Sequence, residues 1–460
     1  MRIDHYDCRT GGSYRYLHVS DGNEFGFHGC FHEVRPPELI VQTFTFEGFP
    51  DGVALEKIVL EDLGDGRTRL TATSLVDSFE ARDAFLASGM EDGVREGYQR
   101  LDELVRQRRF VAPLFSPRRL VGDYLPVLVE EAARLRERWR AAPEATADVH
   151  ALSVAYTLRV IGRVLFGTAL DDVLPRLGLA FARANAYLSA RVTTSSLIPR
   201  SWPTQGNRCG RAAQRELYAI VDGLIEGRRA DPRNAEDLLG RLLRARDPQT
   251  GRPLSAEEVR DQVLIFLLAG HETTATTLAF TLQLLARHPQ VQARVREEVG
   301  AVGHEGILVG DLARAMPYTQ QVLKESLRLY PPVFAVSRYT ATGDVVDGTE
   351  ILAGSNVFVG TFALHRSPQV WPDPARFDPD RFRPAEVARR HRMAWLPFGA
   401  GAHVCIGAQL ATAELTVALA ALIPYLTVVP ANAHAPARPI ASGLVLRPAA
   451  PMPHRLLPRR

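Results

Sequence analysis

Two hydrophobic patterns divide this chain of 460 residues. In its first hundred residues, short runs with strand character alternate with turn signals such as Asp21-Gly22 and Pro36-Pro37. Regularly spaced runs of this kind predict a meander of antiparallel strands. A helix with one apolar side is predicted to follow, from about residue 79 to residue 105. The predicted strands cover residues 13–19, 24–33, 39–46, 53–60 and 68–76.

From residue 106 onward the spacing of apolar residues is mainly helical. One of the predicted helices carries Glu325 and Arg328 and ends at Pro331-Pro332, because proline cannot continue a helix. The other helical patterns cover residues 152–166, 176–191, 208–228 and about 255–288, and short strand-like pieces lie at 338–340, 350–352 and 356–360. A chain of this length usually forms more than one domain, so a strand-rich domain followed by a mainly helical one is expected.

Composition and charge narrow the class of protein. Apolar residues make up 46% of the chain and charged residues 23%, as in ordinary soluble globular proteins. The net charge of +3 is small, and no Lys/Arg-rich run with interleaved aromatic residues is present. The sequence therefore predicts no nucleic-acid partner.

The cysteines and the start of the chain bear on its compartment. Cys8, Cys30, Cys209 and Cys405 lie far apart without paired spacing, which argues against a disulfide framework or a zinc site. The first residues are polar, unlike a signal peptide, and the best apolar run, 263–270, is too short to span a bilayer. A cytoplasmic, bacterial-type protein without a membrane anchor is predicted.

The strongest functional signal surrounds Cys405, in Phe398-Gly-Ala-Gly-Ala-His-Val-Cys-Ile-Gly407. The glycines suit a tight turn, and the helical pattern that follows would aim free N–H groups at the sulfur. The partial positive charge of these N–H groups favours the thiolate form of the cysteine. We interpret Cys405 as a metal ligand, because no second cysteine or nearby catalytic triad accompanies it. The alternative is a buried cysteine on a glycine-rich loop.

A second motif combines Glu325 and Arg328, which are three residues apart and share one face of a helix. Apolar neighbours surround them, so the pair is expected to be buried. A buried ion pair must be fully hydrogen-bonded, which requires a third partner. The alternative is an ordinary surface ion pair that contributes little to stability.

A third motif, Ala269-Gly-His-Glu-Thr-Thr274, lies inside the long helix predicted at 255–288. Gly270 weakens a helix, and Thr273 can bond to the carbonyl one turn earlier. Glu272 and Thr273 place a carboxyl group and a hydroxyl group side by side in this motif. His271 has no partner at ligand spacing and is interpreted as structural. The alternative for the whole motif is a polar notch in a core helix.

The decamer around Cys405 resembles the haem-binding loop of the cytochrome P450 superfamily, the haem-thiolate monooxygenases, and the resemblance extends over residues 106–446. It implies that Cys405 is the axial ligand of a thiolate-ligated haem b. It also implies that Thr273 is the proton-delivering alcohol and Glu272 the acid. Arg381, in Phe377-Asp-Pro-Asp-Arg-Phe382, matches the third member of the family's structural lock with Glu325 and Arg328.

The same resemblance implies further site residues. Haem would be held by Arg108, Arg338 and His403, together with the loop residues Phe398 and Gly399. The substrate pocket would include Ala269, Phe334 and Ala335. The family's usual N-terminal helices, strands and substrate lid have no counterpart here, so the distal side is expected to be more open to water, which favours uncoupled reduction of oxygen.

The strands and long helix of the first 105 residues are similar to the START-like helix-grip fold of the SRPBCC superfamily, close to the activators of heat-shock ATPase. Residues 35–44 and 66–71 carry this similarity. We therefore expect residues 1–105 to form a partial α+β START-like domain, an antiparallel sheet with a C-terminal helix. Residues 106–460 are expected to form a mainly α P450-like haem domain with small β-sheets.

These resemblances predict a monooxygenase that inserts one atom of dioxygen into an apolar small molecule. No flavin or iron–sulfur motif is present, so electrons would come from a separate ferredoxin- or flavodoxin-type partner. Two alternatives remain open. The chain could be a non-catalytic START-like module that binds a small molecule or a chaperone, fused to an inactive haem domain. It could also be a recombined gene product without efficient activity.

Overall fold

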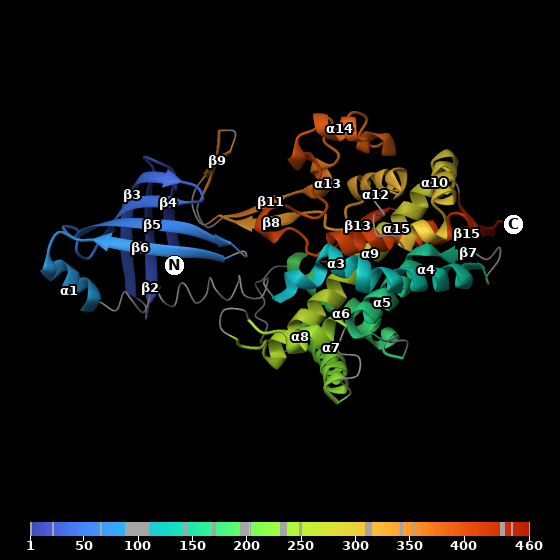
Figure 1. Cartoon of the computed structure of the whole chain (residues 1–460), viewed down its shortest axis with the longest axis horizontal. Coiled ribbons are helices and arrows are strands. Elements are labelled where there is room, and N and C mark those ends of the chain that lie inside the picture. The colour runs from blue at the N-terminus through green and yellow to red at the C-terminus, as the bar shows by residue number, and fades with distance from the viewer. Residues whose placement is uncertain are drawn as a thin grey trace. The chain divides into compact units, whose positions relative to one another are not determined.

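A computed structural model describes residues 2–20, 23–64, 67–87, 110–140, 146–167, 172–193, 202, 204–230, 237–247, 251–308, 315–340, 344–346, 348–352, 355–432, 438–442 and 445–459. The chain forms two compact units (Figure 1). The first comprises Met1–Leu104 and Ser337–Val359. The second comprises Val105–Val336 and Gly360–Arg460.

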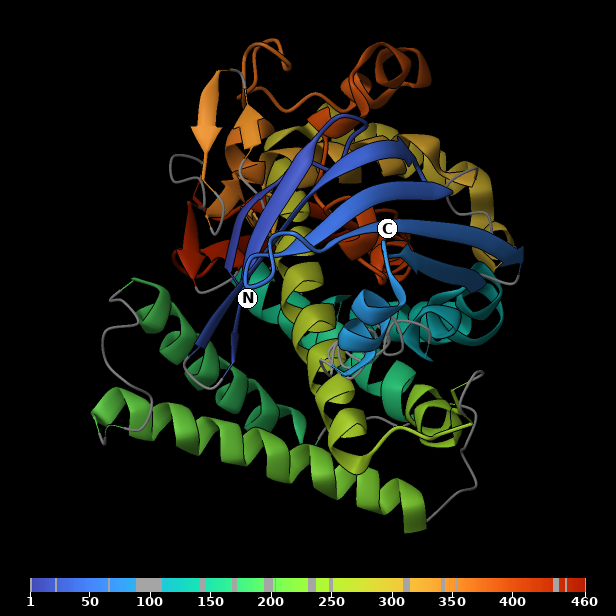
Figure 2. The same cartoon turned by 90° about the vertical axis from the view of Figure 1, so that its left-hand side faces the viewer.

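The first unit contains a six-stranded antiparallel sheet in the order β1-β2-β3-β4-β5-β6, so the predicted meander is confirmed (Figure 2). Its strands are β1 Arg2–Tyr6, β2 Ser13–Ser20, β3 Asn23–Arg35, β4 Leu39–Phe46, β5 Val53–Gly64 and β6 Arg67–Leu75. Strand β1 was not predicted, because this short polar edge strand is recognised only by its pairing with β2. Helix α1, Phe79–Ala87, follows β6, and the rest of the predicted helix lies outside the described residues.

Aromatic side chains cover one face of this sheet. Strand register puts Tyr16 opposite Phe27, and Phe27 opposite Phe46, with ring centroids 5.2 Å apart in both pairs. Tyr14 lies opposite Gly29, where a side chain would collide with the Tyr14 ring. The tyrosine therefore reaches across β3 and donates its hydroxyl to the Thr43 carbonyl on β4, at 2.8 Å. Such cross-strand ring pairs stabilise a sheet beyond the area they bury.

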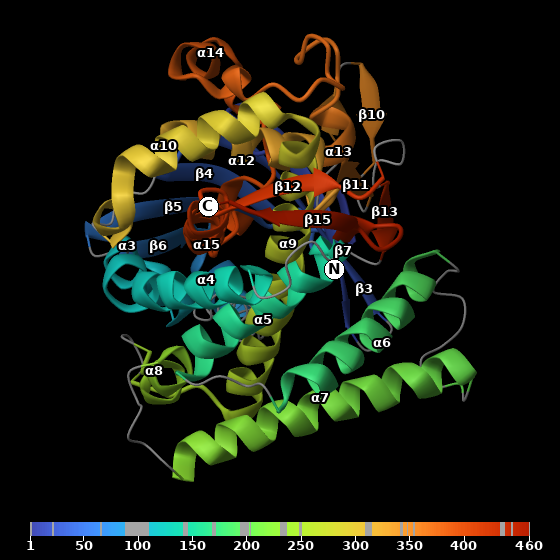
Figure 3. The same ribbon diagram turned by 90° about the vertical axis from the view of Figure 1, so that its right-hand side faces the viewer.

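The second unit is mainly helical, with small sheets, as predicted (Figure 3). Its helices are η1 Ala112–Phe115, α3 Pro117–Arg119, η2 Leu120–Tyr124, α4 Leu125–Arg140, α5 Val149–Phe166, α6 Leu174–Thr193, α7 Gln205–Ala230, α8 Leu238–Arg244, α9 Ala256–Arg287, α10 Pro289–Leu308, α12 Pro317–Leu329, α13 Thr361–Leu364, η4 Pro379–Phe382, α14 Pro384–Arg389, η5 Arg392–Ala394, η6 Gly401–His403 and α15 Ala408–Leu422. The long helices predicted from periodicity are observed as α5, α6, α7, α9 and α12.

The strands beyond residue 105 form several small sheets. In the second unit, β12 Leu426–Pro430, β15 Pro453–Pro458 and β7 Thr146–Asp148 form one sheet, and β13 Pro439–Ser442 pairs with β14 Val445–Pro448. Between Val336 and Val359, β8 Val336–Tyr339 pairs with β11 Asn356–Val359, and β9 Asp344–Val346 pairs with β10 Thr349–Ile351. The strand-like pieces predicted at 338–340, 350–352 and 356–360 correspond to β8, β10 and β11.

Helix α9 runs through the core of the second unit, against α5, α7, α10, α12 and α15. It begins with a capping box, in which Ser255 accepts from the Glu258 N–H and Glu258 accepts from the Ser255 N–H. Residues 274–286 are buried without interruption. The Phe280 ring stacks on Tyr330, at the end of α12, with centroids 4.2 Å apart. This part of α9 is buried on all sides, so it is a core helix, although it includes several threonines.

Two described helices, α5 and α9, are long and apolar enough by length and composition to cross a membrane. Neither helix contains an unbroken apolar run of that length, so neither was predicted to span a bilayer. In the fold, 67% of the most apolar α5 window and 61% of the α9 window are buried against other elements. Their apolar composition is thus accounted for by core packing.

Candidate functional site

The loop around Cys405 leads directly into α15. Gly399 and Gly401 adopt φ angles of 71° and 76°, a left-handed conformation that favours glycine. The Cys405 N–H donates to the Phe398 carbonyl at 2.9 Å and closes the turn. The Cys405 side chain is exposed, and a Cβ at Gly407 would lie 4.0 Å from its Sγ. The loop therefore presents the sulfur just before the N-terminus of α15, where the helix dipole favours a thiolate.

The donor set at Cys405 fits the haem implied by the sequence. No group of three or more His, Cys, Asp and Glu that could hold a metal ion occurs among the described residues. A tetrahedral zinc site built from protein ligands requires such a group. A haem brings its own ring nitrogens and needs one axial protein ligand, which a single exposed thiolate can provide.

Glu325 and Arg328 of α12 form a fully buried ion pair, with both side chains 0% exposed. Arg328 Nε donates to Glu325 Oε2 at 2.7 Å, and Arg328 Nη2 donates to Oε1 at 2.8 Å. Arg381 Nε lies 3.6 Å from Oε1, and the Asp378 N–H donates to Oε1 at 2.9 Å. The structure thus brings the predicted trio together. Burial raises the pKa of Glu325, while Arg328 and the Asp378 N–H oppose that shift.

The remaining donors of Arg328 hold the chain segment after β11. Arg328 donates to the carbonyls of His365 and Pro374, both at 2.8 Å, and to that of Arg376 at 3.1 Å. The guanidinium therefore satisfies a set of buried carbonyls as well as the carboxylate. A lysine could not do so, because it lacks the planar fork of donors.

His365 connects this cluster to the segment that precedes the cysteine loop. Its side chain is 0% exposed, and its Nε2 accepts from the Leu396 N–H at 2.8 Å. Burial, reinforced by the charge of Arg328, lowers the pKa of His365 to about 4. This role of His365 was not predicted, because no local spacing relates His365 to Leu396.

The acid–alcohol motif lies on α9, as predicted. Thr273 Oγ1 donates to the Ala269 carbonyl, one turn earlier, at 2.7 Å. Glu272 Oε2 accepts from Asn185 Nδ2 of α6 at 2.6 Å, and burial raises the pKa of Glu272. His271 is buried, and its Nδ1 lies 2.5 Å from the Leu267 carbonyl, in keeping with its structural interpretation.

The other predicted site residues occupy varied positions. Ala269 is exposed on α9, Phe334 and Ala335 are half-buried after α12, and His403 is exposed in η6. The Phe334 carbonyl accepts from the Phe362 N–H at 3.0 Å. Arg338 is exposed on β8, in the first unit, and Arg108 lies outside the described residues. The group of Arg108, Arg338 and His403 therefore stays a prediction.

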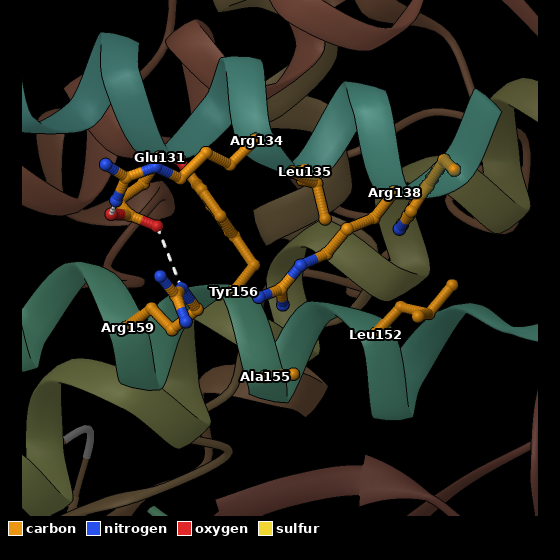
Figure 4. A pocket seen from close by; sticks show the side chains of 9 residues that line it. Glu131, Arg134, Leu135, Arg138, Leu152, Ala155, Tyr156 and Arg159 are labelled. Carbon is orange, nitrogen blue, oxygen red and sulfur yellow. Dashed lines mark hydrogen bonds and ion pairs between the residues drawn. The ribbon is translucent and has the colours of Figure 1, made fainter. Parts of the chain in front are cut away.

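A hollow of about 30 Å³ lies between α4 and α5 (Figure 4). Glu131, which is buried on α4, forms ion pairs with Arg134, Arg159 and Arg163. Figure 4 shows Arg159 reaching from α5 toward this carboxylate. None of the predicted site residues lines the hollow. We interpret the cluster as a link between the two helices.

Comparisons with known proteins match two families to the chain, one to each end. The family described as Cytochrome P450 matches residues 97–454, and the family described as Activator of Hsp90 ATPase homolog 1-like protein matches residues 2–106. Among curated relatives, cyclooctat-9-en-7-ol 5-monooxygenase from Streptomyces melanosporofaciens is 37% identical over 319 residues, covering 69% of this chain and 68% of the relative. Pentalenene oxygenase from Streptomyces avermitilis is 32% identical over 347 residues, covering 75% of each.

Solved structures include the crystal structure of the cytochrome P450DA heme domain. It superposes with a TM-score of 0.68 at 30% identity, over 76% of each chain. The similarity confirms the predicted fold of the helical part.

Replacing Arg328 with methionine is expected to lower the free energy of unfolding by about 3–5 kcal/mol, because Glu325 would be left as an uncompensated buried charge. Urea unfolding followed by circular dichroism measures this. The matched control is Arg381→Met, whose 3.6 Å contact with Glu325 is looser and whose side chain is 11% exposed. A loss of about 1 kcal/mol is expected there. Equal losses in the two variants would contradict the central place given to Arg328.

His365 is expected to make the fold sensitive to acid. Because its pKa is lowered to about 4 in the folded state, the unfolded chain takes up the proton first, so stability falls as the pH drops from about 6.5 toward 4. Between pH 7 and pH 5 this contribution is about 2 kcal/mol. His365→Gln, which keeps an acceptor but does not titrate, is expected to remove that part of the pH dependence.

Urea unfolding at pH 7 and pH 5 compares the wild type with His365→Gln. His391→Gln, at an exposed histidine, serves as the control and should keep the wild-type slope. If His365→Gln also keeps that slope, the protonation of His365 is not linked to unfolding.

Proposed function

The chain belongs to the cytochrome P450 family of oxidoreductases, and on that premise we propose that it is a haem-thiolate monooxygenase that acts on an apolar, terpenoid-type small molecule. The observation that carries this proposal is the Cys405 loop, which presents an exposed sulfur before the N-terminus of α15. When bound, haem b supplies the activation of dioxygen, one atom of which enters the substrate while the other leaves as water.

We propose that Cys405 would hold the haem iron through its thiolate. The N-terminal dipole of α15 stabilises its negative charge, and the turn closed between Phe398 and Cys405 holds the sulfur in place. Gly399 supplies the left-handed backbone of this turn. Phe398, Gly399 and His403 would line the cysteine side of the haem. Arg108 and Arg338 would pair with its propionates.

On the distal side, we assign proton delivery to Glu272 and Thr273. The Thr273 hydroxyl, bonded to the Ala269 carbonyl, is a donor and acceptor on α9. The Glu272 carboxyl is half-buried, and burial raises its pKa, so it holds a proton more firmly than an exposed glutamate does. Ala269, Phe334 and Ala335 would supply the apolar contacts to substrate.

The substrate class follows from two kinds of support. The residues proposed for the pocket carry no charge, so they favour an apolar ligand. Two of the relatives are named for cyclooctat-9-en-7-ol and for pentalenene, which are terpenoid compounds. We infer a polycyclic terpenoid or a similar hydrocarbon-rich molecule as the substrate of this chain.

Electrons are proposed to come from a separate ferredoxin- or flavodoxin-type protein.

The two family matches support a division of the chain near residue 105 into a START-like domain and a haem domain. A cytoplasmic location remains our proposal.

A second candidate function concerns the N-terminal unit. Its six-stranded sheet carries a cluster of aromatic side chains on one face, which includes Tyr16, Phe27, Phe44 and Phe46. All four are half-buried. An apolar face of this kind favours binding of a hydrophobic small molecule by the START-like part.

The ligand assignment predicts the spectrum of the carbon monoxide complex. Reduced wild-type protein with carbon monoxide is expected to show the red-shifted Soret band of a thiolate-ligated haem. Cys405→Ala is expected to lose that band, because the loop Phe398–Gly407 contains no second cysteine that could replace it. The matched control, Cys209→Ala, removes an exposed cysteine on α7 and should retain the band. A Cys405→Ala protein with an unchanged band would overturn the assignment.

The distal assignment predicts how Thr273→Val divides the consumed electrons. With NADPH and a surrogate ferredoxin system, we expect product formation to fall by at least about tenfold while peroxide release rises, because the delivering hydroxyl is lost. Thr277→Val is the control, since Thr277 makes the same bond to the carbonyl four residues earlier but is buried. Similar product loss in both variants would point to a general effect on α9.

A further inference from the structure

Glu272 is tied to a helix other than its own. Its Oε2 accepts from Asn185 Nδ2 at 2.6 Å, although the two residues are 87 positions apart in the chain. Asn185 lies on α6 and is only 9% exposed, so solvent does not compete freely for its amide. The contact therefore fixes one carboxylate oxygen of Glu272 toward α6.

Among the residues that the structure describes, few other groups act on the Glu272 carboxylate. The positive charge of Arg447 on β14 favours the ionised form of Glu272, but less strongly than the hydrogen bond from Asn185 does. His271, its neighbour on α9, has its Nδ1 next to the Leu267 carbonyl and its ring against Phe181 of α6. The hydrogen-bond partner of the acid is thus a neutral amide rather than a cation.

A neutral amide has a property that a cation lacks. Asparagine carries both a donor and an acceptor, so it can donate Nδ2–H to a carboxylate or, after the amide turns over, accept the O–H of a carboxylic acid through Oδ1. A lysine or arginine would hold the carboxylate ionised. An apolar residue would leave the burial of the charge uncompensated.

We propose that Asn185 is a positioning residue that lets Glu272 alternate between carboxylate and carboxylic acid without losing its hydrogen-bond partner. This inference rests on the proposed function, in which Glu272 is the acid of proton delivery. Helix α6 would then influence the protonation of Glu272 on α9, in addition to packing against α7.

The experiment changes the partner and follows the protonation of Glu272. In Asn185→Lys the added cation should lower the pH at which Glu272 ionises, by on the order of one unit, and in Asn185→Leu the loss of the donor should raise it. The infrared carbonyl band of the protonated carboxyl, identified by its absence in Glu272→Gln, is recorded against pH in the resting protein. The acidic limb of the pH–rate profile should move in the same direction.

The matched control is Ala186→Lys, which adds the same charge to α6 at the adjacent, exposed position. Solvent and salt screen a charge there, so the carbonyl band should titrate as in the wild type. Equal titration of the Asn185→Lys and Ala186→Lys proteins would overturn the inference. If Asn185→Lys does not fold, as judged by circular dichroism, an Asn185→Leu band that titrates like the wild type would overturn it.

Failure of the proposed function gives a different result. If Glu272→Gln leaves the ratio of product to peroxide unchanged, Glu272 is not the delivering acid, yet the infrared titration still reports whether Asn185 governs its protonation. If Glu272→Gln abolishes coupling while the Asn185 variants titrate like the wild type, only the inference about Asn185 fails.

Discussion

The helical part of this protein depends on one buried ion pair, Glu325–Arg328. Two charges that are withdrawn completely from water are tolerated only when every donor and acceptor is satisfied. Arg328 meets this requirement by bonding both carboxylate oxygens and the carbonyls of three residues far along the chain, namely His365, Pro374 and Arg376. The bonds that satisfy the buried Arg328 guanidinium therefore also hold the segment that follows β11 in place.

The same segment links the ion pair to the ligand loop. His365, held through its carbonyl by Arg328, accepts the Leu396 N–H with its ring. Trp395, the residue before Leu396, donates its Nε1 to the Lys324 carbonyl on α12 at 3.2 Å. Two contacts thus connect α12 to the chain just ahead of Phe398. These contacts hold the residues that lead into the glycine-rich loop, and the bond from the Cys405 N–H to the Phe398 carbonyl closes the turn that follows.

The motif of Glu272 and Thr273 on α9 differs from the buried ion pair, because these two contacts are hydrogen bonds to neutral groups. Thr273 bonds to the Ala269 carbonyl within α9, and Glu272 rests against a neutral amide instead of a cation. On the assignment proposed above, Glu272 would exchange its proton, so a partner that serves both protonation states is more useful there than a strong ion pair. The buried pair on α12 has a structural part, whereas the motif on α9 is proposed to change its protonation state.

The sequence by itself determined what depends on near neighbours. The start of the long helix near residue 255, the Glu325–Arg328 pair and the Cys405 loop all depend on residues that are close in sequence, and spacing predicted them. The distant Arg381 was assigned to the pair through the family resemblance. The tertiary structure decided the other contacts between distant segments. Strand β1, the His365–Leu396 bond and the Asn185–Glu272 bond were not foreseen, because each joins residues that spacing does not relate. The packing of whole helices and strands determines which distant residues meet. Local residue spacing does not reveal these partners.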